Sequence, residues 1–422
     1  MDIEKLVSQF SDEVVPLTQK LVSFPSINKP PHGQEGDCQN YISAWLKAVC
    51  DDVDVFEPTS VDGIESHPSY WPGRDYSDRP NVVGVIKGSG GGKSLLLNGH
   101  VDVVPDDPKP WIHEPFSGEI VEKRIYGRGS LDMKGGLAAG MIALKIIRES
   151  GIKLAGDVIL ESVVDEEYAG ANGTLACILK GYKADAAISM EPTWMEVGTS
   201  MRSGRLYEFM AKGIAGMPIG IEGNANPAYI ISRMALGVEE FDRQRNQAVI
   251  NDPLFSKNPW PLPAITVKMK AGQVEPGGLI GIPDNSWLHT WVYGLPNSTA
   301  EQLDNEVFTF FNAWIEKDPI LKKNKPSITS QTRFLDGSEI PQDHQIAQTV
   351  IKYAQNAANL KTLVTPVDVT GDNGLLVRLG KTPTICFGPG GANLHAADEF
   401  VNIEDLKNLV KIYTHTILEW CR

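Results

Sequence analysis

A histidine and an aspartate follow an apolar segment in the first quarter of the chain. The segment SLLLNGHVDVVP runs into His100, and Asp102 stands two residues later. Because residues i and i+2 of a strand face the same side, both side chains can point into one site at the end of this strand. Asp102 would then orient the imidazole of His100 and fix its tautomer for metal binding. The alternative is a surface His–Asp pair in a turn.

Two adjacent carboxylates follow another apolar segment. In ILESVVDEEYAG, Glu166 and Glu167 precede Gly170. Neighbouring carboxylates can divide the work of a hydrolytic metal site, since one binds the ion while the other takes a proton from metal-bound water. The alternative for this pair is an ordinary polar loop after a strand.

Three further candidates occupy comparable positions. Asp132 lies in YGRGSLDMKGG, where its alternative role is to cap the next helix. Glu191 ends the apolar run AAISM, and His395 stands in the glycine-rich loop CFGPGGANLHAADEF. With His100 and one member of the Glu166–Glu167 pair, they place two histidines and three carboxylates at strand ends, where open α/β sheets collect their ligands. This mixed set suits zinc, or manganese and cobalt if oxygen ligands dominate.

The segments around these residues predict an α/β fold. Apolar runs at 81–88, 94–104, 157–164 and 186–190 have the length and composition of strands. They alternate with helical patterns at 135–150 and 170–181, and two amphipathic helices are expected at 2–22 and 37–48. Alternating strands and helices favour a mixed, mostly parallel sheet as the centre of a catalytic domain.

The pattern changes after residue 202. Strands are expected in GRLYEFMAKG, AITVKMKAG, SWLHTWVYGL and PSITSQTRFL, and helices in NPAYIISRMALGVEEFDRQRN and STAEQLDNEVFTFFNAWIEKD. The resulting βαββαβ order predicts an α+β domain. We therefore expect a catalytic domain formed by residues 1–202 and 336–422, interrupted by an inserted domain at 203–335.

The length, net charge and cysteine content of the chain exclude several classes of protein. The chain has 422 residues, which favours two domains, and a formal charge of −14, which argues against nucleic acid or an anionic membrane as partner. Neither a secretory signal nor an apolar run long enough to span a bilayer is visible. The five cysteines are widely spaced and odd in number, so we expect reduced thiols and a cytoplasmic protein.

These motifs, taken in order, resemble the metallopeptidase and amidohydrolase family of acetylornithine deacetylase, succinyl-diaminopimelate desuccinylase, aminoacylase and glutamate carboxypeptidase. The matching segments extend over nearly the whole chain. They are NGHVDVVP, the 111–116 run ending in PF, IYGRGSLDMKGG, DEEYAG, SMEP and FGPGG…HAADE.

The resemblance implies two divalent ions, Zn²⁺, Mn²⁺ or Co²⁺, bridged by Asp132. His100 and Glu191 would complete the shell of one ion, and Glu167 and His395 that of the other. Each ligand position is occupied by a residue type that the family uses.

The resemblance also assigns the remaining roles. Glu166 would be the general base that activates the water and later protonates the leaving nitrogen, and Asp102 would orient His100. The inserted domain would act as a lid and form the contact of a homodimer. The reaction implied is hydrolysis of a C–N bond in a small molecule, as in a deacylase or amidohydrolase.

The lid departs from the family pattern at three positions. Met217 stands where the family has a histidine that polarises the scissile carbonyl, Ile280 replaces an asparagine, and Tyr293 replaces an arginine. A thioether donates no hydrogen bond and cannot stabilise an oxyanion as an imidazole does.

Three interpretations of these departures remain. Other lid residues, such as Arg202, Arg205 or Asn226, can supply the donors for an ordinary amide substrate. Alternatively, the substrate is an amine on an electron-poor aromatic ring, as for the related 5-nitroanthranilate aminohydrolase, and Met217 packs against that ring. The third interpretation is a non-catalytic metal-binding descendant.

Overall fold

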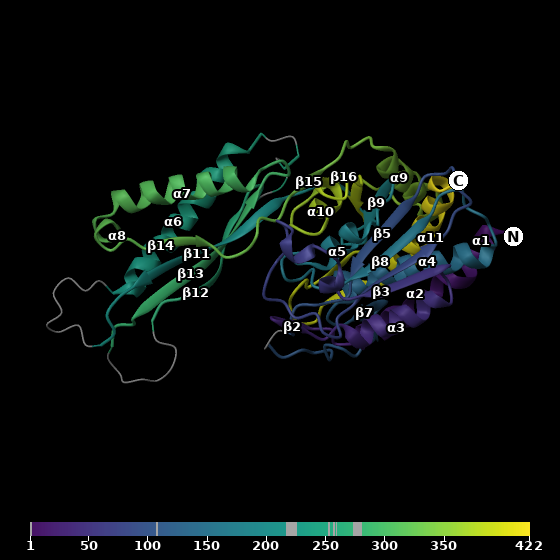
Figure 1. Cartoon of the computed structure of the whole chain (residues 1–422), viewed down its shortest axis with the longest axis horizontal. Helices are drawn as coiled ribbons and strands as arrows, with labels where there is room; N and C mark the ends of the chain where they lie inside the picture. Colours follow the sequence, from purple (N-terminus) through teal and green to yellow (C-terminus); the bar gives the residue numbers. More distant parts are fainter. Residues whose placement is uncertain are drawn as a thin grey trace. The chain divides into compact units, whose positions relative to one another are not determined.

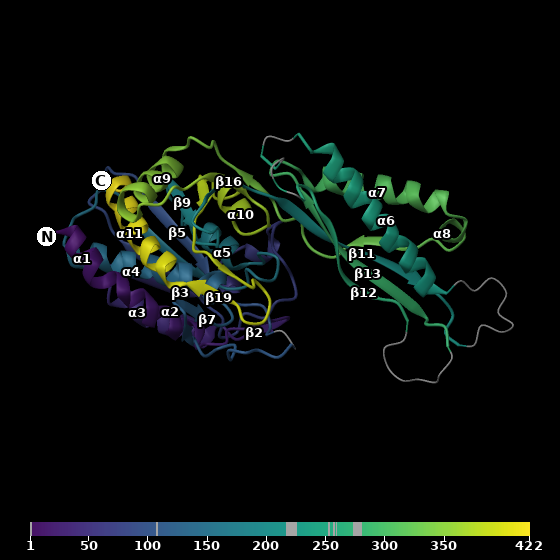
Figure 2. The same ribbon diagram turned by 180° about the vertical axis from the view of Figure 1, so that it is seen from behind.

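The computed structural model describes residues 2–106, 109–216, 226–251, 254–255, 258, 260–272 and 281–422 (Figures 1 and 2). The chain divides into two compact units. Unit 1 contains Met1–Met201, Ser338–Val367 and Gly371–Arg422, and unit 2 contains Arg202–Gly337 with Asp368–Thr370. The last of these segments was expected in the catalytic domain.

Unit 1 is built on a mixed sheet, as the sequence predicts. Among the described residues it has nine strands, in the order β15-β10-β17-β9-β5-β8-β4-β3, with β16 also paired to β10. Parallel pairing joins β17, β9, β5 and β8 at the centre, whereas β4 pairs antiparallel with β3 and β8. The strands are β3 Asp52–Phe56, β4 Asn81–Ile86, β5 Leu95–His100, β8 Val158–Val163, β9 Ala186–Ser189, β10 Val197–Met201, β15 Ser338–Glu339, β16 Val364–Val367 and β17 Thr384–Cys386.

Helices cover both faces of this sheet. On β5, Leu95 and Leu97 pack into the core cluster that includes helices α4 and α11, and Leu96 packs into the cluster that includes α5 and α10. This alternation follows from the two-residue period of a strand. The helices of unit 1 are α1 Ile3–Phe10, α2 Val14–Val22, α3 Gly36–Lys47, α4 Gly135–Ser150, α5 Gly173–Lys180, α9 Gln345–Ala358, α10 Asn373–Arg378 and α11 Ile403–Trp420.

Short strands organise the loops of unit 1. They form two small sheets, with the orders β1-β2 and β18-β19-β7-β6. Their bounds are β1 Asn28–Lys29, β2 His32–Gly33, β6 Ile120–Val121, β7 Arg124–Tyr126, β18 Gly391–Ala392 and β19 Phe400–Asn402.

Unit 2 has the βαββαβ order that the sequence predicts, with one short extra helix, α8. Its antiparallel sheet has the order β12-β13-β11-β14, and Phe209 of β11 packs with Ile231 of α6 and Phe311 of α7 in a separate core. The elements are β11 Ser203–Lys212, α6 Pro227–Ala248, β12 Ala264–Lys270, β13 Asn285–Gly294, α7 Ala300–Lys317, α8 Pro319–Lys323 and β14 Ser327–Ser330.

The N-terminal helix differs from its prediction. A single helix was expected over residues 2–22, but a 3₁₀ turn at Ser11–Glu13 separates α1 from α2. Among the helices that the structure describes, none combines the length and apolarity needed to cross a membrane.

Candidate metal centre

The six predicted ligand and base residues lie close together at the carboxyl ends of the central strands of the unit 1 sheet. Strand β5 lies between β8 and β9 and runs parallel to both, so the carboxyl ends of the three strands meet. His100 ends β5, two glutamates follow β8, and the other residues come from the loops before α4, after β9 and between β18 and β19. The six are His100, Asp132, Glu166, Glu167, Glu191 and His395.

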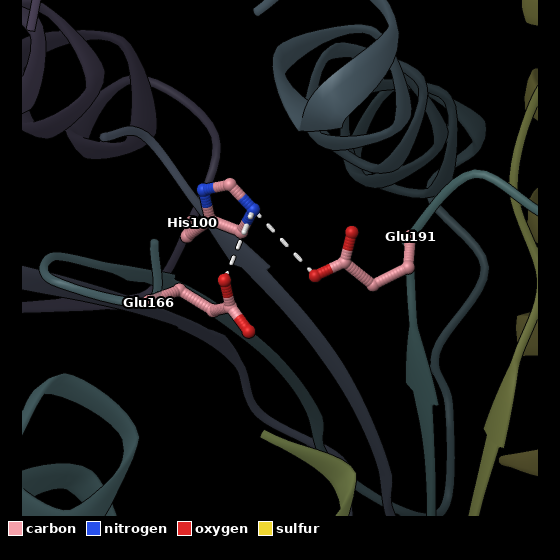
Figure 3. A group of neighbouring side chains, drawn as sticks. All are labelled: His100, Glu166 and Glu191. Carbon is pink, nitrogen blue, oxygen red and sulfur yellow. Dashed lines mark ion pairs between the residues drawn. The ribbon is translucent and has the colours of Figure 1, made fainter. Parts of the chain in front are cut away.

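One group of donor atoms surrounds the buried imidazole of His100. Its Nε2 atom lies 3.2 Å from Oδ1 of Asp132, 3.5 Å from Oε1 of Glu191 and 3.9 Å from Oε2 of Glu166. Figure 3 shows both glutamates directed toward the same ring nitrogen. Donor atoms of His100, Glu166 and Glu191 all lie within 4.8 Å of one another, and so do donor atoms of His100, Asp132 and Glu167, so each of these groups is compact enough to hold an ion.

A second group surrounds His395. Its Nε2 atom lies 3.1 Å from Oε2 of Glu167 and 3.3 Å from Oδ2 of Asp132. Asp132 therefore turns one carboxylate oxygen toward each imidazole, which is the arrangement of a bridging ligand. The side chain of His395 is half exposed, so the centre is open to solvent on this side.

The backbone around Asp132 is held from a distant part of the chain. Oε1 of Glu399 accepts hydrogen bonds from the backbone N–H groups of Leu131 (3.0 Å) and Asp132 (3.2 Å), while its Oε2 pairs with Arg128 at 2.8 Å. Asp132 has non-helical φ/ψ inside the irregular turn Ser130–Lys134 that leads into α4. Glu399 was not selected from the sequence, although it stands in the HAADE segment that carries the resemblance.

Asp102 approaches His100 more closely through its backbone carbonyl than through its carboxylate. The Nδ1 atom of His100 lies 2.9 Å from the backbone carbonyl oxygen of Asp102 but 3.7 Å from its carboxylate. The carbonyl therefore orients the ring. The carboxylate accepts hydrogen bonds from the backbone N–H groups of Glu166 (3.1 Å) and Glu167 (3.0 Å), so it supports the turn after β8.

The electrostatics of the six residues suit a cation. Burial raises the pKa of Glu166 and Glu191 well above the ordinary range, and it raises that of Glu167 as well. The Glu167 carboxylate raises the pKa of His395 to about 11. Four carboxylates crowded beside two imidazoles gain from positive charge, and this oxygen and nitrogen donor set fits divalent metal ions.

The residues predicted to bind substrate have other contacts. Arg202 donates to the carbonyl oxygens of Asp368 and Trp260, and Arg205 forms a pair with both oxygens of Asp304. The Asn226 side chain caps α6. All these contacts lie within unit 2, and they give each side chain a structural role; substrate binding by these three residues stays a prediction.

Two of the three lid departures lie outside the described residues. These are Met217 and Ile280. Tyr293 belongs to β13, where the Arg202 guanidinium lies 5.5 Å from the centre of its ring.

The chain is similar to several known proteins. A sequence model of the family described as peptidase family M20/M25/M40 matches residues 96–419. The N-formyl-4-amino-5-aminomethyl-2-methylpyrimidine deformylase of Bacillus subtilis is 28% identical, over 99% of this chain and 97% of that protein. The succinyl-diaminopimelate desuccinylase of Methylobacterium radiotolerans is 26% identical, over 95% of each chain.

Among solved structures, the dipeptidase Dug1p of Saccharomyces cerevisiae superimposes with a TM-score of 0.78 over 99% of this chain and 98% of that one, at 14% identity, so this likeness concerns the fold. The relatives named here lend no support to the aromatic aminohydrolase interpretation. Since the family match spans most of the chain, the protein belongs to peptidase family M20/M25/M40 and is a hydrolase that acts on C–N bonds.

Proposed function

We propose that this chain is a metal-dependent deacylase that hydrolyses the amide bond of a small N-acyl compound. The observation that carries the proposal is the placement of Asp132 between two imidazoles, with one oxygen toward His100 and the other toward His395. A carboxylate in this position can serve two cations at once. Together with the carboxylate of Glu166 close to His100, it supplies the groups for a hydrolytic site.

The protein residues divide into two ligand sets. His100 and Glu191 would hold one ion and Glu167 and His395 the other, with Asp132 shared. When bound, Zn²⁺, Mn²⁺ or Co²⁺ would lower the pKa of a water molecule and polarise the substrate carbonyl.

Glu166 is the proton carrier in this proposal. Its side chain is mostly buried in the turn after β8, and that burial raises its pKa well above that of a free glutamate. A carboxylate with a raised pKa is a stronger base, so it can accept a proton from water and return it to the leaving nitrogen. Its attachment beside Glu167 keeps it at the edge of the ligand set.

We further propose an N-formyl group as the preferred acyl group. The Bacillus subtilis relative is named as a deformylase of an aminomethylpyrimidine derivative. A formyl carbonyl is less hindered and more electrophilic than an acetyl or succinyl carbonyl. It therefore depends less on an oxyanion donor in the lid, where Met217 stands at the position of the family histidine.

A substrate panel tests this function. The purified protein, supplied with Zn²⁺, Mn²⁺ or Co²⁺, is assayed on N-formyl, N-acetyl and N-succinyl amides that share one aminomethylpyrimidine amine, and on dipeptides. We expect kcat/KM to be highest for the formyl amide and activity to be lost with a chelator. Efficient cleavage of simple N-acetyl amino acids, at about 10⁴ M⁻¹s⁻¹ or more, would contradict the formyl preference. Full activity of metal-free protein would contradict the metal-dependent mechanism.

Homodimer formation through unit 2 and a cytoplasmic location belong to the same proposal. Both come from the sequence, the first by family resemblance and the second from the odd number and wide spacing of the cysteines.

A further inference from the structure

Three buried carboxylates lie behind the metal centre. Oxygen atoms of Glu35, Asp102 and Asp165 approach one another within 4.8 Å, and the three side chains are buried. Such a group could be mistaken for another metal site. Here the positive charge comes from the protein itself, because the guanidinium groups of Arg74 and Arg79 are inserted among the carboxylates.

Asp165 is the centre of this buried network. Its carboxylate accepts hydrogen bonds from Nε of Arg74 (2.8 Å), the Tyr76 hydroxyl (2.6 Å), Nη2 of Arg79 (2.9 Å) and Nδ2 of Asn28 (2.8 Å), and a further one from Nη2 of Arg74. Charge-assisted bonds of this kind are stronger than neutral ones, and the side chain has no exposed surface. The carboxylate therefore has little freedom to move.

Because Asp165 is fixed, the chain that follows it is fixed as well. Asp165 has a φ of 71°, in the left-handed region, and is the residue directly before Glu166 and Glu167. In an extended strand these two neighbours would point to opposite faces. The turn that starts after Asp165 instead directs both toward the ligand set, where they lie near His100 and His395 respectively.

Asn28 connects Asp165 to Asp102, the second carboxylate that contacts this turn. Its Nδ2 atom donates to Asp102 as well as to Asp165, both at 2.8 Å, while its Oδ1 atom accepts from Nη2 of Arg74 at 2.6 Å. Asp102 in turn accepts the backbone N–H groups of Glu166 and Glu167. Arg74 therefore holds both carboxylates that fix this turn, one directly and one through Asn28.

We propose that Arg74 is a positioning residue of the metal centre, acting through Asp165 and Asn28 on the turn that presents Glu166 and Glu167. The inference rests on the proposed function, because it requires those two glutamates to serve the centre. Arg74 lies before residue 96, where the match to the family model begins, so that match does not include it.

The geometry requires a guanidinium rather than any cation. Arg74 uses Nε and Nη2 together on Asp165 and shares Nη2 with Asn28. A lysine ammonium is a single point donor on a flexible stem and cannot reproduce this fork. Arg74→Lys keeps the charge in the buried network but loosens the turn, whereas Arg74→Met removes the charge as well.

Metal affinity is the direct test. Metal-stripped wild type, Arg74→Lys and Arg74→Met are titrated with Zn²⁺ in competition with a chelating dye, and circular dichroism checks their folding. Removing an outer partner of metal ligands costs about 10–100-fold in affinity, so we expect that loss for Arg74→Met and a smaller one for Arg74→Lys. We also expect kcat to fall more than KM changes, because the Arg74 side chain is only 1% exposed and is enclosed by its protein partners.

A matched control separates positioning from general loss of a buried arginine. Arg245 pairs with Glu306 in unit 2, and its side chain is only 3% exposed. We expect Arg245→Met to change the Zn²⁺ affinity by no more than about twofold. We also expect Arg74→Met to cost less affinity in an Asp165→Asn background than in the wild type, because only the path through Asn28 and Asp102 then remains.

The possible outcomes are distinguishable. Folded Arg74 variants with Zn²⁺ affinities within about twofold of the wild type would overturn the inference. If Arg74→Met does not fold, Arg74→Lys decides by the same limit. Equal losses in the Asp165→Asn and wild-type backgrounds would overturn the path through Asp165. A wild type that binds none of the three ions would instead overturn the proposed metal centre.

Discussion

Asp132 and the Glu166–Glu167 pair show how adjacent or shared carboxylates can have separate tasks. Asp132 turns its two oxygens toward different histidines. Glu166 and Glu167 are neighbours in the chain, yet one lies near His100 and the other near His395. Local backbone geometry, rather than residue type, therefore distinguishes a proposed base from a proposed ligand.

The role of Glu166 can be tested with an isosteric change. Glu166→Gln keeps the shape of the side chain but removes its capacity to accept a proton. We expect kcat to fall by about 10²–10⁴-fold while the metal content stays that of the wild type. Steady-state kinetics and elemental analysis on the same sample measure both quantities. A rate like that of the wild type would exclude Glu166 from the mechanism.

The shared carboxylate makes a prediction about metal content. Because Asp132 faces both histidines, Asp132→Ala should remove more metal than Glu191→Ala or His395→Ala, each of which affects one set. Elemental analysis after dialysis against buffer with a fixed Zn²⁺ concentration gives the comparison. Equal metal loss in all three variants would show that Asp132 does not bridge.

At the scale of single residues, the sequence allows site residues to be predicted where they lie at or after the end of an apolar strand. His100 could be selected because it ends a recognisable strand, and Glu191 and the glutamate pair because they closely follow one. Glu399 and Arg74 could not, since their partners are far away in the chain: 268 residues separate Glu399 from Leu131, and 91 separate Arg74 from Asp165. Only the folded chain brings such pairs together.

Strand β8 positions part of the metal centre and also carries a buried carboxyl group. It leads into the turn with Glu166, and it also carries Glu161, whose side chain is buried beside Asn98 and Cys177. Burial raises the pKa of Glu161 from 4.5 to about 8. The folded protein thus retains a proton here at neutral pH.

This retained proton predicts a pH-dependent stability. Below pH 4.5 Glu161 is protonated in both states; above it the unfolded chain releases the proton while the folded chain keeps it up to pH about 8, so stability falls with rising pH across that window. Glu161→Gln should flatten this decline and raise the melting temperature at pH 8, by about 2 °C or less for each kcal/mol recovered.

Thermal unfolding between pH 5 and pH 8 measures this effect. Glu301→Gln, an exposed change on α7, is the control and should leave the slope as it is in the wild type. A Glu161→Gln protein that keeps the wild-type slope would show that another group controls the decline.

At the scale of elements, periodicity predicts helices and strands better than it predicts their neighbours. The expected helix at 37–48 is found as α3, Gly36–Lys47, and the βαββαβ order of unit 2 is found. Residue patterns state which face of a strand is apolar but not which strand lies beside it. The insertion of β17 between β9 and β10, and the antiparallel strands at the margins of the sheet, were therefore not predictable.

At the scale of the molecule, the inserted unit is the expected site of self-association. Unit 2 has its own core and its own sheet, which ends in strands β12 and β14. By resemblance, it should join two copies of the chain. Light scattering at micromolar concentration should then give twice the 46.1 kDa of one chain. A particle with the mass of a single chain would contradict this expectation.

The position of β17 also has a consequence for how the protein is made. Strands β9 and β10 leave the ribosome before unit 2, but β17, which lies between them, is synthesised after it. Until residue 386 emerges, the large sheet is divided and the edges of β9 and β10 lack their shared neighbour. Unpaired strand edges favour aggregation, so a nascent chain stalled within unit 2 should need a chaperone. His395 emerges later still, so the metal centre cannot be complete until translation has passed this residue.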